Sequence, residues 1–183
     1  MTAAAIEEGQ LGGRRIRRVV LSADQVQARV GELARDISAA YRAEDRLLVI
    51  GILKGSFIFL ADLVREITIP LHVDFLVAAS YGAGRTTSGD VRLLYDPAVS
   101  LEGRAVLVVE DIVDSGTTLD KLLPLLEARA PASLEVCALL HKRLSGADLE
   151  PRWVGFDAPN EFLVGYGLDH AEDFRHLPYI ASL

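Results

Sequence analysis

Three carboxylates and a short run of small residues follow an apolar segment in the middle of the chain. Residues 105–118 read AVLVVEDIVDSGTT, so that Glu110 and Asp111 end the apolar run and Asp114 comes within one further turn. Carboxylate oxygens are ligands that a divalent cation such as Mg²⁺ prefers. The residues Ser115 to Thr118 are small enough to wrap backbone N–H groups around a phosphate at a helix N-terminus. The stretch therefore indicates a site that holds a divalent cation beside a phosphorylated sugar.

Two other apolar segments end in residues that fit the same site. The run 47–53 is followed by Lys54, Gly55 and Ser56, and the run 133–140 is followed by His141, Lys142 and Arg143. Ligands of an open α/β sheet lie at the carboxyl ends of its strands. If these runs are neighbouring parallel strands, acids, phosphate donors and cations meet in one crevice. The alternatives are a pair of solvated acids at 110–111 and a lysine at 54 that merely ends a strand.

The elements that must position these residues follow from the hydrophobic pattern. Apolar runs of strand length alternate with helix-period segments, which is typical of a parallel α/β sheet flanked by helices. Ser22 and Gln25 form the pattern of a capping box, which starts a helix that runs to about Tyr41. Ser56 should cap a helix over 57–66, and a third helix should cover 118–129. We expect strands at 18–21, 47–53, 73–79, 91–95, 106–109, 133–140, 153–156 and 163–166.

Three segments depart from this alternation. Ser80 to Asp90 is polar, contains glycines and lacks periodicity, so we expect a mobile loop at the tip of a hairpin between strands 73–79 and 91–95. Pro124 lies inside the third helix, where it should remove one hydrogen bond and cause a kink, unless that helix begins later. The region from His141 onward mixes short strands with turns, and it should fold back over the sheet.

Length and composition favour one globular domain. The chain has 183 residues, of which 50% are hydrophobic and 25% are charged, so a substantial core can form without disulfides. The net charge of −7 argues against a broad surface for nucleic acid or acidic membranes. The arginines at 14, 15, 17 and 18 are therefore interpreted as a solvated edge, with nucleic acid as the alternative.

The N-terminus and the cysteine bear on location. No apolar stretch reaches the roughly 18 residues that a membrane span needs. Residues 1–13 carry acids where a signal peptide carries basic charge, so we expect a disordered tail there and a single domain over 14–183. Cys137 lies in an apolar run and should be a buried thiol, which fits a reducing cytoplasm.

With its third acid and Ser-Gly-Thr-Thr turn, the string 105–118 resembles the phosphoribosyl pyrophosphate signature of type I phosphoribosyltransferases. It differs from a Walker A loop and from a dinucleotide-binding turn. Four more segments look like those of the bacterial hypoxanthine (6-oxopurine) phosphoribosyltransferases, in the expected order: LKGS at 53–56, ASYG at 79–82, LLHK at 139–142 and EFLVGYGLDHAEDFRHLPYI at 161–180. The likeness covers roughly residues 15–181.

The resemblance implies a fold and a reaction. The fold is that of the type I phosphoribosyltransferases, a central, mainly parallel sheet flanked by helices, with a small C-terminal hood largely from 143–183. The reaction is a Mg²⁺-dependent transfer of the phosphoribosyl group to N9 of hypoxanthine and/or guanine, which gives IMP or GMP and pyrophosphate. Such a purine-salvage enzyme would be cytoplasmic and a homodimer or homotetramer, without nucleic-acid or membrane partners.

The resemblance also implies roles for single residues. Asp114 would be the general base toward the purine N7 proton, and Lys142 would donate to the purine O6. The remaining assignments, by ligand, are the phosphoribosyl group with its 5′-phosphate (Glu110, Asp111, Asp114, Ser115, Gly116, Thr117, Thr118), pyrophosphate (Lys54, Gly55, Arg175), the purine (Ile112, Lys142, Phe162, Leu163, Asp169), and Mg²⁺ (Glu110, Asp111, Asp169). In the family the peptide before Lys54 can be cis.

Some assignments rest on the resemblance alone. Ser80 and Tyr81 would open a loop that closes over the site. Phe162 and Ile112 would sandwich the purine, whereas read by themselves they would be core residues. His170 stands where many relatives have an aromatic residue, while His72, His141 and His176 lack metal-ligand spacing and are interpreted as structural or solvated.

Two other function classes stay open. Some proteins with this sheet and signature are regulators that sense the sugar donor and bind nucleic acid, and a structural α/β domain is the third reading. The sequence does not fix the choice among hypoxanthine, guanine and xanthine.

Overall fold

The computed structural model describes residues 14–80, 91–143 and 150–183. The loop residue Tyr81 and the tail 1–13 lie outside them. Along the chain the elements are β1 (Arg18–Leu21), α1 (Ala23–Ala40), the 3₁₀ turn η2 (Ala43–Asp45), β2 (Leu48–Leu53), α2 (Phe57–Glu66), β3 (His72–Ser80), β4 (Val91–Tyr95), β5 (Ala105–Val113), α3 (Thr117–Glu127), β6 (Ser133–His141), β7 (Trp153–Asp157), β8 (Leu163–Val164) and β9 (Ile180–Ser182).

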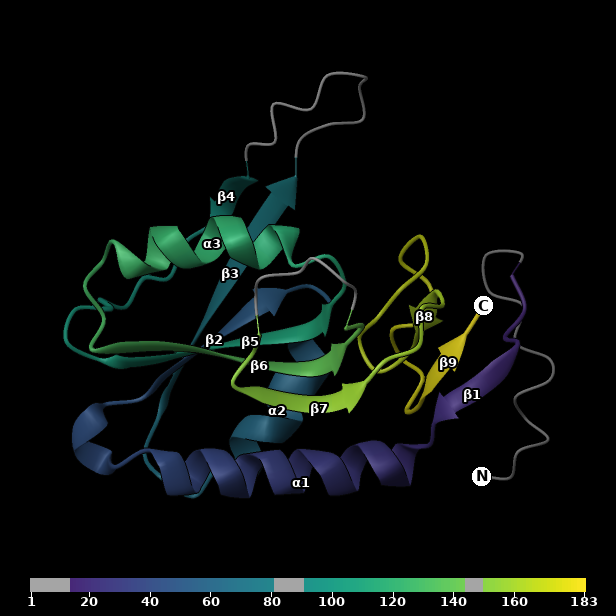
Figure 1. Ribbon diagram of the computed structural model, residues 1–183, viewed down its shortest axis with the longest axis horizontal. Coiled ribbons are helices and arrows are strands. Elements are labelled where there is room, and N and C mark those ends of the chain that lie inside the picture. The colour runs from purple at the N-terminus through teal and green to yellow at the C-terminus, as the bar shows by residue number, and fades with distance from the viewer. Residues whose placement is uncertain (1–13, 81–90, 144–149) are drawn as a thin grey trace.

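Six strands form the central sheet, in the order β4-β3-β2-β5-β6-β7. All neighbours are parallel except β4, which runs antiparallel to β3. The expected α/β class and the hairpin between β3 and β4 are confirmed. Because parallel strands point the same way, β2, β5, β6 and β7 end at one edge of the sheet, beside the hood (Figure 1).

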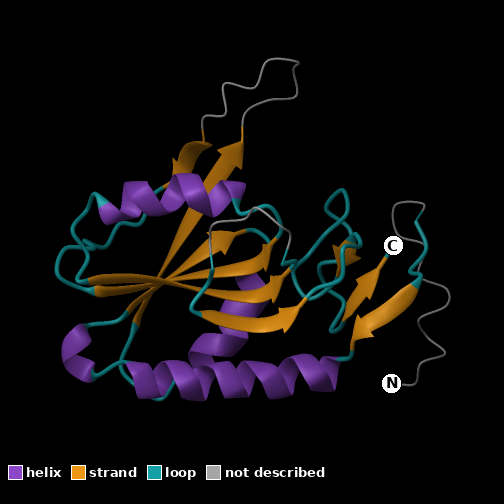
Figure 2. Cartoon of the chain, in the orientation of Figure 1, coloured by secondary structure: helices purple, strands orange, loops and turns teal. Residues whose placement is uncertain are grey.

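Helices cover both faces of this sheet. α1 and α2 lie on one face and α3 on the other (Figure 2). Alternate residues of β5 belong to different cores: Leu107 and Val109 pack with α1 and α2, and Val106 and Val108 pack with α3. A strand buried on both faces has no polar alternation, which explains the continuous apolar run before Glu110.

A second sheet forms the hood, and its membership differs from the expectation. It is three-stranded and antiparallel, in the order β1-β9-β8. The segment 153–157, expected in the hood, is instead an edge strand of the central sheet, parallel to β6. The strand 163–166 is shorter than expected and ends at Val164, since Gly165 and Tyr166 take positive φ of 96° and 51°.

The helix starts are partly as expected. The capping box of α1 is present, with Gln25 N donating to Ser22 Oγ at 3.2 Å and Ser22 N to Gln25 Oε1 at 2.9 Å. Ser56 is the N-cap residue of α2, as expected, but its side chain does not cap the helix, because its hydroxyl donates back to the carbonyl of Ile52 at 2.6 Å. α3 begins at Thr117, earlier than expected, and contains Pro124. No helix among the described residues is long and apolar enough to cross a membrane.

Candidate active site

The two adjacent acids lie within β5, which continues four residues beyond the expected end at Val109. Successive side chains of a strand point to opposite faces. Glu110 therefore faces α3 with Val108, and Asp111 faces the side of α1 and α2 with Val109. This alternation separates two acids that are neighbours in sequence, so each belongs to a different half of the site.

Both carboxyl groups are poorly hydrated. Burial, with the adjacent Asp111, raises the pKa of Glu110 well above its usual range, and its Oε2 has no hydrogen-bond partner among the described residues. Burial raises the pKa of Asp111 to about 6, although Ile112 N donates to its Oδ1 at 2.9 Å. Both carboxylates would therefore be stabilised by a cation.

The loop after β5 encloses a hollow at the N-terminus of α3. The hollow has a volume of about 80 Å³ and is lined by Glu110 and by residues 112–119. Gly116 turns the chain with φ of 77°, and the hydroxyls of Ser115 and Thr117 lie 2.9 Å apart. The first N–H groups of a helix have no intrahelical acceptor and attract anions. The loop 114–118, which we call the phosphate loop, can therefore hold a phosphate group.

A tightly packed corner connects β2, β5 and the hood. The Leu53–Lys54 peptide is cis. A Cβ added to Gly55 would lie 1.7 Å from Asp111 Oδ2, and one added to Gly167 would lie 2.0 Å from the carbonyl oxygen of Gly55. Gly55 is thus held between the Asp111 carboxylate and Gly167, and only glycine fits at either position.

Two cations of this corner are paired with acids of the hood. Lys54 Nζ lies 3.1 Å from Glu172 Oε2. Arg175 donates from Nη1 to the Gly167 carbonyl at 2.8 Å, and its Nη2 lies 2.8 Å from Asp169 and 3.3 Å from Glu172. Beside the larger effect of burial, Arg175 lowers and Asp169 raises the pKa of Asp111, so the hood charges act on this acid. The structure thus brings Lys54, Gly55 and Arg175 to one corner.

The end of β6 faces the phosphate loop. Lys142 follows β6, and its Nζ lies 2.7 Å from Asp114 Oδ2. The lysine side chain is only 11% exposed, whereas that of Asp114 is 53% exposed. The base proposed for proton transfer and the proposed O6 donor are therefore direct neighbours.

The side chains expected around a purine differ in exposure. Phe162 is 55% exposed, so its interpretation as a core residue is wrong. Its ring lies edge-on to His170, with centroids 5.4 Å apart. Leu163 is buried in β8, and Ile112 is half-buried. An exposed aromatic ring beside a strand end is suited to stacking on a flat ligand.

A metal at this site would need ligands beyond the protein. No group of three or more His, Cys, Asp or Glu side chains in the described ranges is arranged to hold a metal ion, so Glu110, Asp111 and Asp169 do not form a closed cluster. Mg²⁺ usually binds one or two carboxylates and completes its shell with water and substrate phosphates. The poorly hydrated acids of β5 fit that partial donor set.

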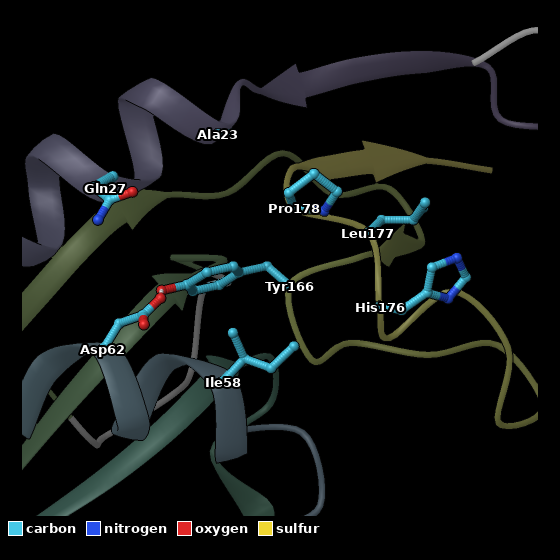
Figure 3. Close-up of a pocket in the computed structure, with 8 residues that line it drawn as sticks. All are labelled: Ala23, Gln27, Ile58, Asp62, Tyr166, His176, Leu177 and Pro178. Atoms are coloured by element: carbon cyan, nitrogen blue, oxygen red, sulfur yellow. Dashed lines mark hydrogen bonds between the residues drawn. The ribbon is translucent and has the colours of Figure 1, made fainter. Parts of the chain in front are cut away.

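Sequence reasoning missed the contacts that join the hood to the rest of the site. Glu172 and Gly167 were not singled out, although an acid and a second glycine stand in the quoted segment 161–180. It also missed the hydroxyl of Tyr166, which donates to Asp62 Oδ2 of α2 at 2.6 Å. Figure 3 shows this contact at a hollow of about 270 Å³ between α1, α2 and the hood. His141 is buried, with both ring nitrogens lacking a described partner.

Known proteins share both the sequence and this architecture. Residues 21–171 match the family described as phosphoribosyl transferase domain. The chain belongs to this family.

Two relatives match nearly the full length. A hypoxanthine phosphoribosyltransferase of Salmonella typhimurium is 44% identical over 167 residues, which cover 90% of this chain and 94% of that protein. A hypoxanthine-guanine phosphoribosyltransferase of Mycobacterium avium is 49% identical, covering 92% and 86%. The crystal structure of a hypoxanthine-guanine phosphoribosyltransferase from Bacillus anthracis, with a HEPES molecule in the active site, superposes with a TM-score of 0.87 at 45% identity, covering 92% and 99%.

Proposed function

We propose that this phosphoribosyltransferase transfers the 5-phosphoribosyl group of phosphoribosyl pyrophosphate to N9 of hypoxanthine and/or guanine. The products are IMP or GMP and pyrophosphate, which is a purine-salvage reaction. The observation that carries the proposal is the contact of Lys142 with Asp114 beside the phosphate loop. This contact places a donor for the purine O6 and an acceptor for the N7 proton beside the phosphate loop, which would bind the phosphorylated sugar.

A bound purine would replace the contact between Lys142 and Asp114 with one contact to each of these side chains. A 6-oxopurine carries O6 as an acceptor next to N7–H as a donor. Lys142 would donate to O6 and Asp114 would accept the N7 proton, so the ion pair opens and each group keeps a partner. Loss of that proton makes N9 more nucleophilic, and positioned acid–base catalysis contributes about 10²- to 10⁴-fold in rate. Phe162 and Ile112 would cover the ring faces, and the Leu163 backbone its edge.

The sugar donor would lie along the ends of β2 and β5. Residues Asp114, Ser115, Gly116, Thr117 and Thr118 would hold the 5′-phosphate, and Glu110 and Asp111 the ribose hydroxyls. Lys54, Gly55 and Arg175 would hold the pyrophosphate. When bound at Asp111 and Asp169, Mg²⁺ would neutralise charge on the leaving pyrophosphate. The loop that Ser80 opens would exclude water.

The assembly and location follow the same proposal. We infer a homodimer or homotetramer, which is supported by the apolar side chains that β3 exposes, Val73 at 39% and Phe75 at 36%. A cytoplasmic location fits the free, buried thiol of Cys137. The nucleic-acid regulator receives no support from the relatives, and a gel-shift assay at physiological salt should show no binding.

The test is turnover with purified protein. Phosphoribosyl pyrophosphate, Mg²⁺ and hypoxanthine should yield IMP and pyrophosphate, and competition among hypoxanthine, guanine and xanthine would rank the bases. Absence of turnover with all three would refute the proposal.

A single variant separates the base role from binding. Asp114→Asn should lose about 10²- to 10⁴-fold in kcat, while the KM for the sugar donor changes little. The matched control is Asp157→Asn, which neutralises an exposed acid at the end of β7 that forms an ion pair with Arg143. An unchanged kcat in Asp114→Asn would show that Asp114 is not the general base.

A further inference from the structure

A third hollow lies at the end of the central sheet away from the hood. Its volume is about 280 Å³, and it is lined by the turn after η2, by the segment before β3 and by Arg104 before β5. The amino ends of β2, β3 and β5 meet here (Figure 1). Since the active site is at the carboxyl ends of the same strands, the length of the sheet separates the two.

Arg104 is a buried cation without an acid. The residue is only 4% exposed. Its Nε donates to the carbonyl of Arg46 at 3.0 Å, and in the described part of the chain no carboxylate lies within ion-pair distance of its guanidinium. Arginine is almost never this buried unless it is paired, because desolvation of the charge is costly. An anion bound in the hollow would supply such a partner.

The surroundings of Arg104 concentrate positive charge. Burial lowers the pKa of Arg104, and Arg46, which lines the same hollow, lowers it further. His72 is a further lining residue, and Leu47, Leu71 and Pro70 supply apolar walls. Acids do not contribute to this lining, although the chain carries a net charge of −7. In this poorly solvated hollow the two arginines attract an anion more strongly than they would in water, and no acid among the described lining residues repels it.

We propose that this hollow binds a phosphate group, as inorganic phosphate or as a small phosphate monoester. The guanidinium fork matches two phosphate oxygens, which favours phosphate over a halide. The volume lies below the range of about 300 to 1,000 Å³ typical of drug-sized ligands, so the site takes a small molecule and does not enclose a nucleotide.

Calorimetric titration with inorganic phosphate at constant ionic strength tests the site. Arg104→Gln and Arg46→Asn should each weaken one binding event by at least about tenfold, which is about 1.4 kcal/mol. Arg46→Asn is the variant expected to fold normally even if Arg104→Gln does not. Arg46 is exposed, and its φ of 53° is a conformation that asparagine tolerates. Arg42→Asn is the control, since it removes the same charge outside the lining.

The native chain and the three variants share the phosphate loop. Phosphate binding at that loop therefore contributes equally to every isotherm and does not affect the comparison. Identical isotherms for the native chain and Arg46→Asn would overturn the proposal. A crystal grown with tungstate gives the position: density on the Arg104 guanidinium supports the site, and density only at the phosphate loop contradicts it. Transferase activity of Arg46→Asn should equal that of the native chain, so this test does not depend on the proposed reaction.

Discussion

Replacement of Gly55 by alanine tests whether close packing fixes the pyrophosphate corner. The added Cβ would lie 1.7 Å from Oδ2 and 2.5 Å from Cγ of Asp111. The carboxylate or the backbone must therefore move by more than about 1 Å, since van der Waals contacts between carbon atoms lie near 3.5 to 4.0 Å. That movement breaks the hydrogen bond from Ile112 N to Asp111 Oδ1.

The size of the effect follows from this lost bond. Hydrogen bonds to charged groups contribute about 1.5 to 3 kcal/mol to stability. In a chain of this length 1 kcal/mol shifts Tm by about 2 to 4 °C, so Gly55→Ala should lower Tm by about 3 to 12 °C. The KM for phosphoribosyl pyrophosphate should rise as well, because the same backbone is proposed to hold the pyrophosphate. Differential scanning calorimetry and steady-state kinetics measure the two effects.

The same substitution elsewhere supplies the controls. Gly31 lies in α1 with nothing within 4 Å of an added Cβ. Gly31→Ala should therefore raise stability by about 0.5 to 1 kcal/mol. Gly103 also has open space but a φ of 65°, so Gly103→Ala isolates the cost of the left-handed backbone. If Gly55→Ala melts at the same temperature as Gly31→Ala, the close approach does not constrain the site and the reasoning is refuted.

Three further predictions concern single contacts. Tyr166→Phe should destabilise the chain by about 1.5 to 3 kcal/mol in urea unfolding, because its hydroxyl donates to Asp62; an unchanged midpoint would show that this contact does not secure the hood. Ser22→Ala should cost about 1 kcal/mol through the capping box, and Ser100→Ala, outside any helix, should cost less. Burial raises the pKa of Cys137 from 9.0 to about 12, so its stabilisation is complete below pH 9 and is lost as pH rises toward 12. Cys137→Ala should therefore flatten the alkaline fall in stability, and labelling of the native thiol at pH 8 would contradict the assignment.

The sequence was most informative where local patterns determine structure. The double-sided burial of β5 appears as a continuous apolar run, and the capping box of α1 depends on two residues three apart. The phosphate loop, Lys54 and Lys142 follow apolar strands directly, so parallel order was enough to bring them together.

What escaped prediction depends on long-range packing. Trp153–Asp157 carries no local sign that its partner is β6 and not the hood. β1 pairs with β9 across almost the whole chain, and no periodicity encodes that choice. Phe162 is apolar yet 55% exposed, because exposure depends on what the hood leaves uncovered. The Gly55–Gly167 contact likewise exists only once the hood has docked.

Among the described residues, three cations of the active site already have acid partners: Lys142 with Asp114, Lys54 with Glu172, and Arg175 with Asp169. Each of these cations is thus already paired in the ligand-free protein, and the proposed pyrophosphate would replace the carboxylates of Glu172 and Asp169 on Lys54 and Arg175. Part of the electrostatic gain is offset by separating these pairs, which limits the affinity for the pyrophosphate product and favours its release. Because charge is exchanged and not newly neutralised, binding at this corner should depend only weakly on ionic strength.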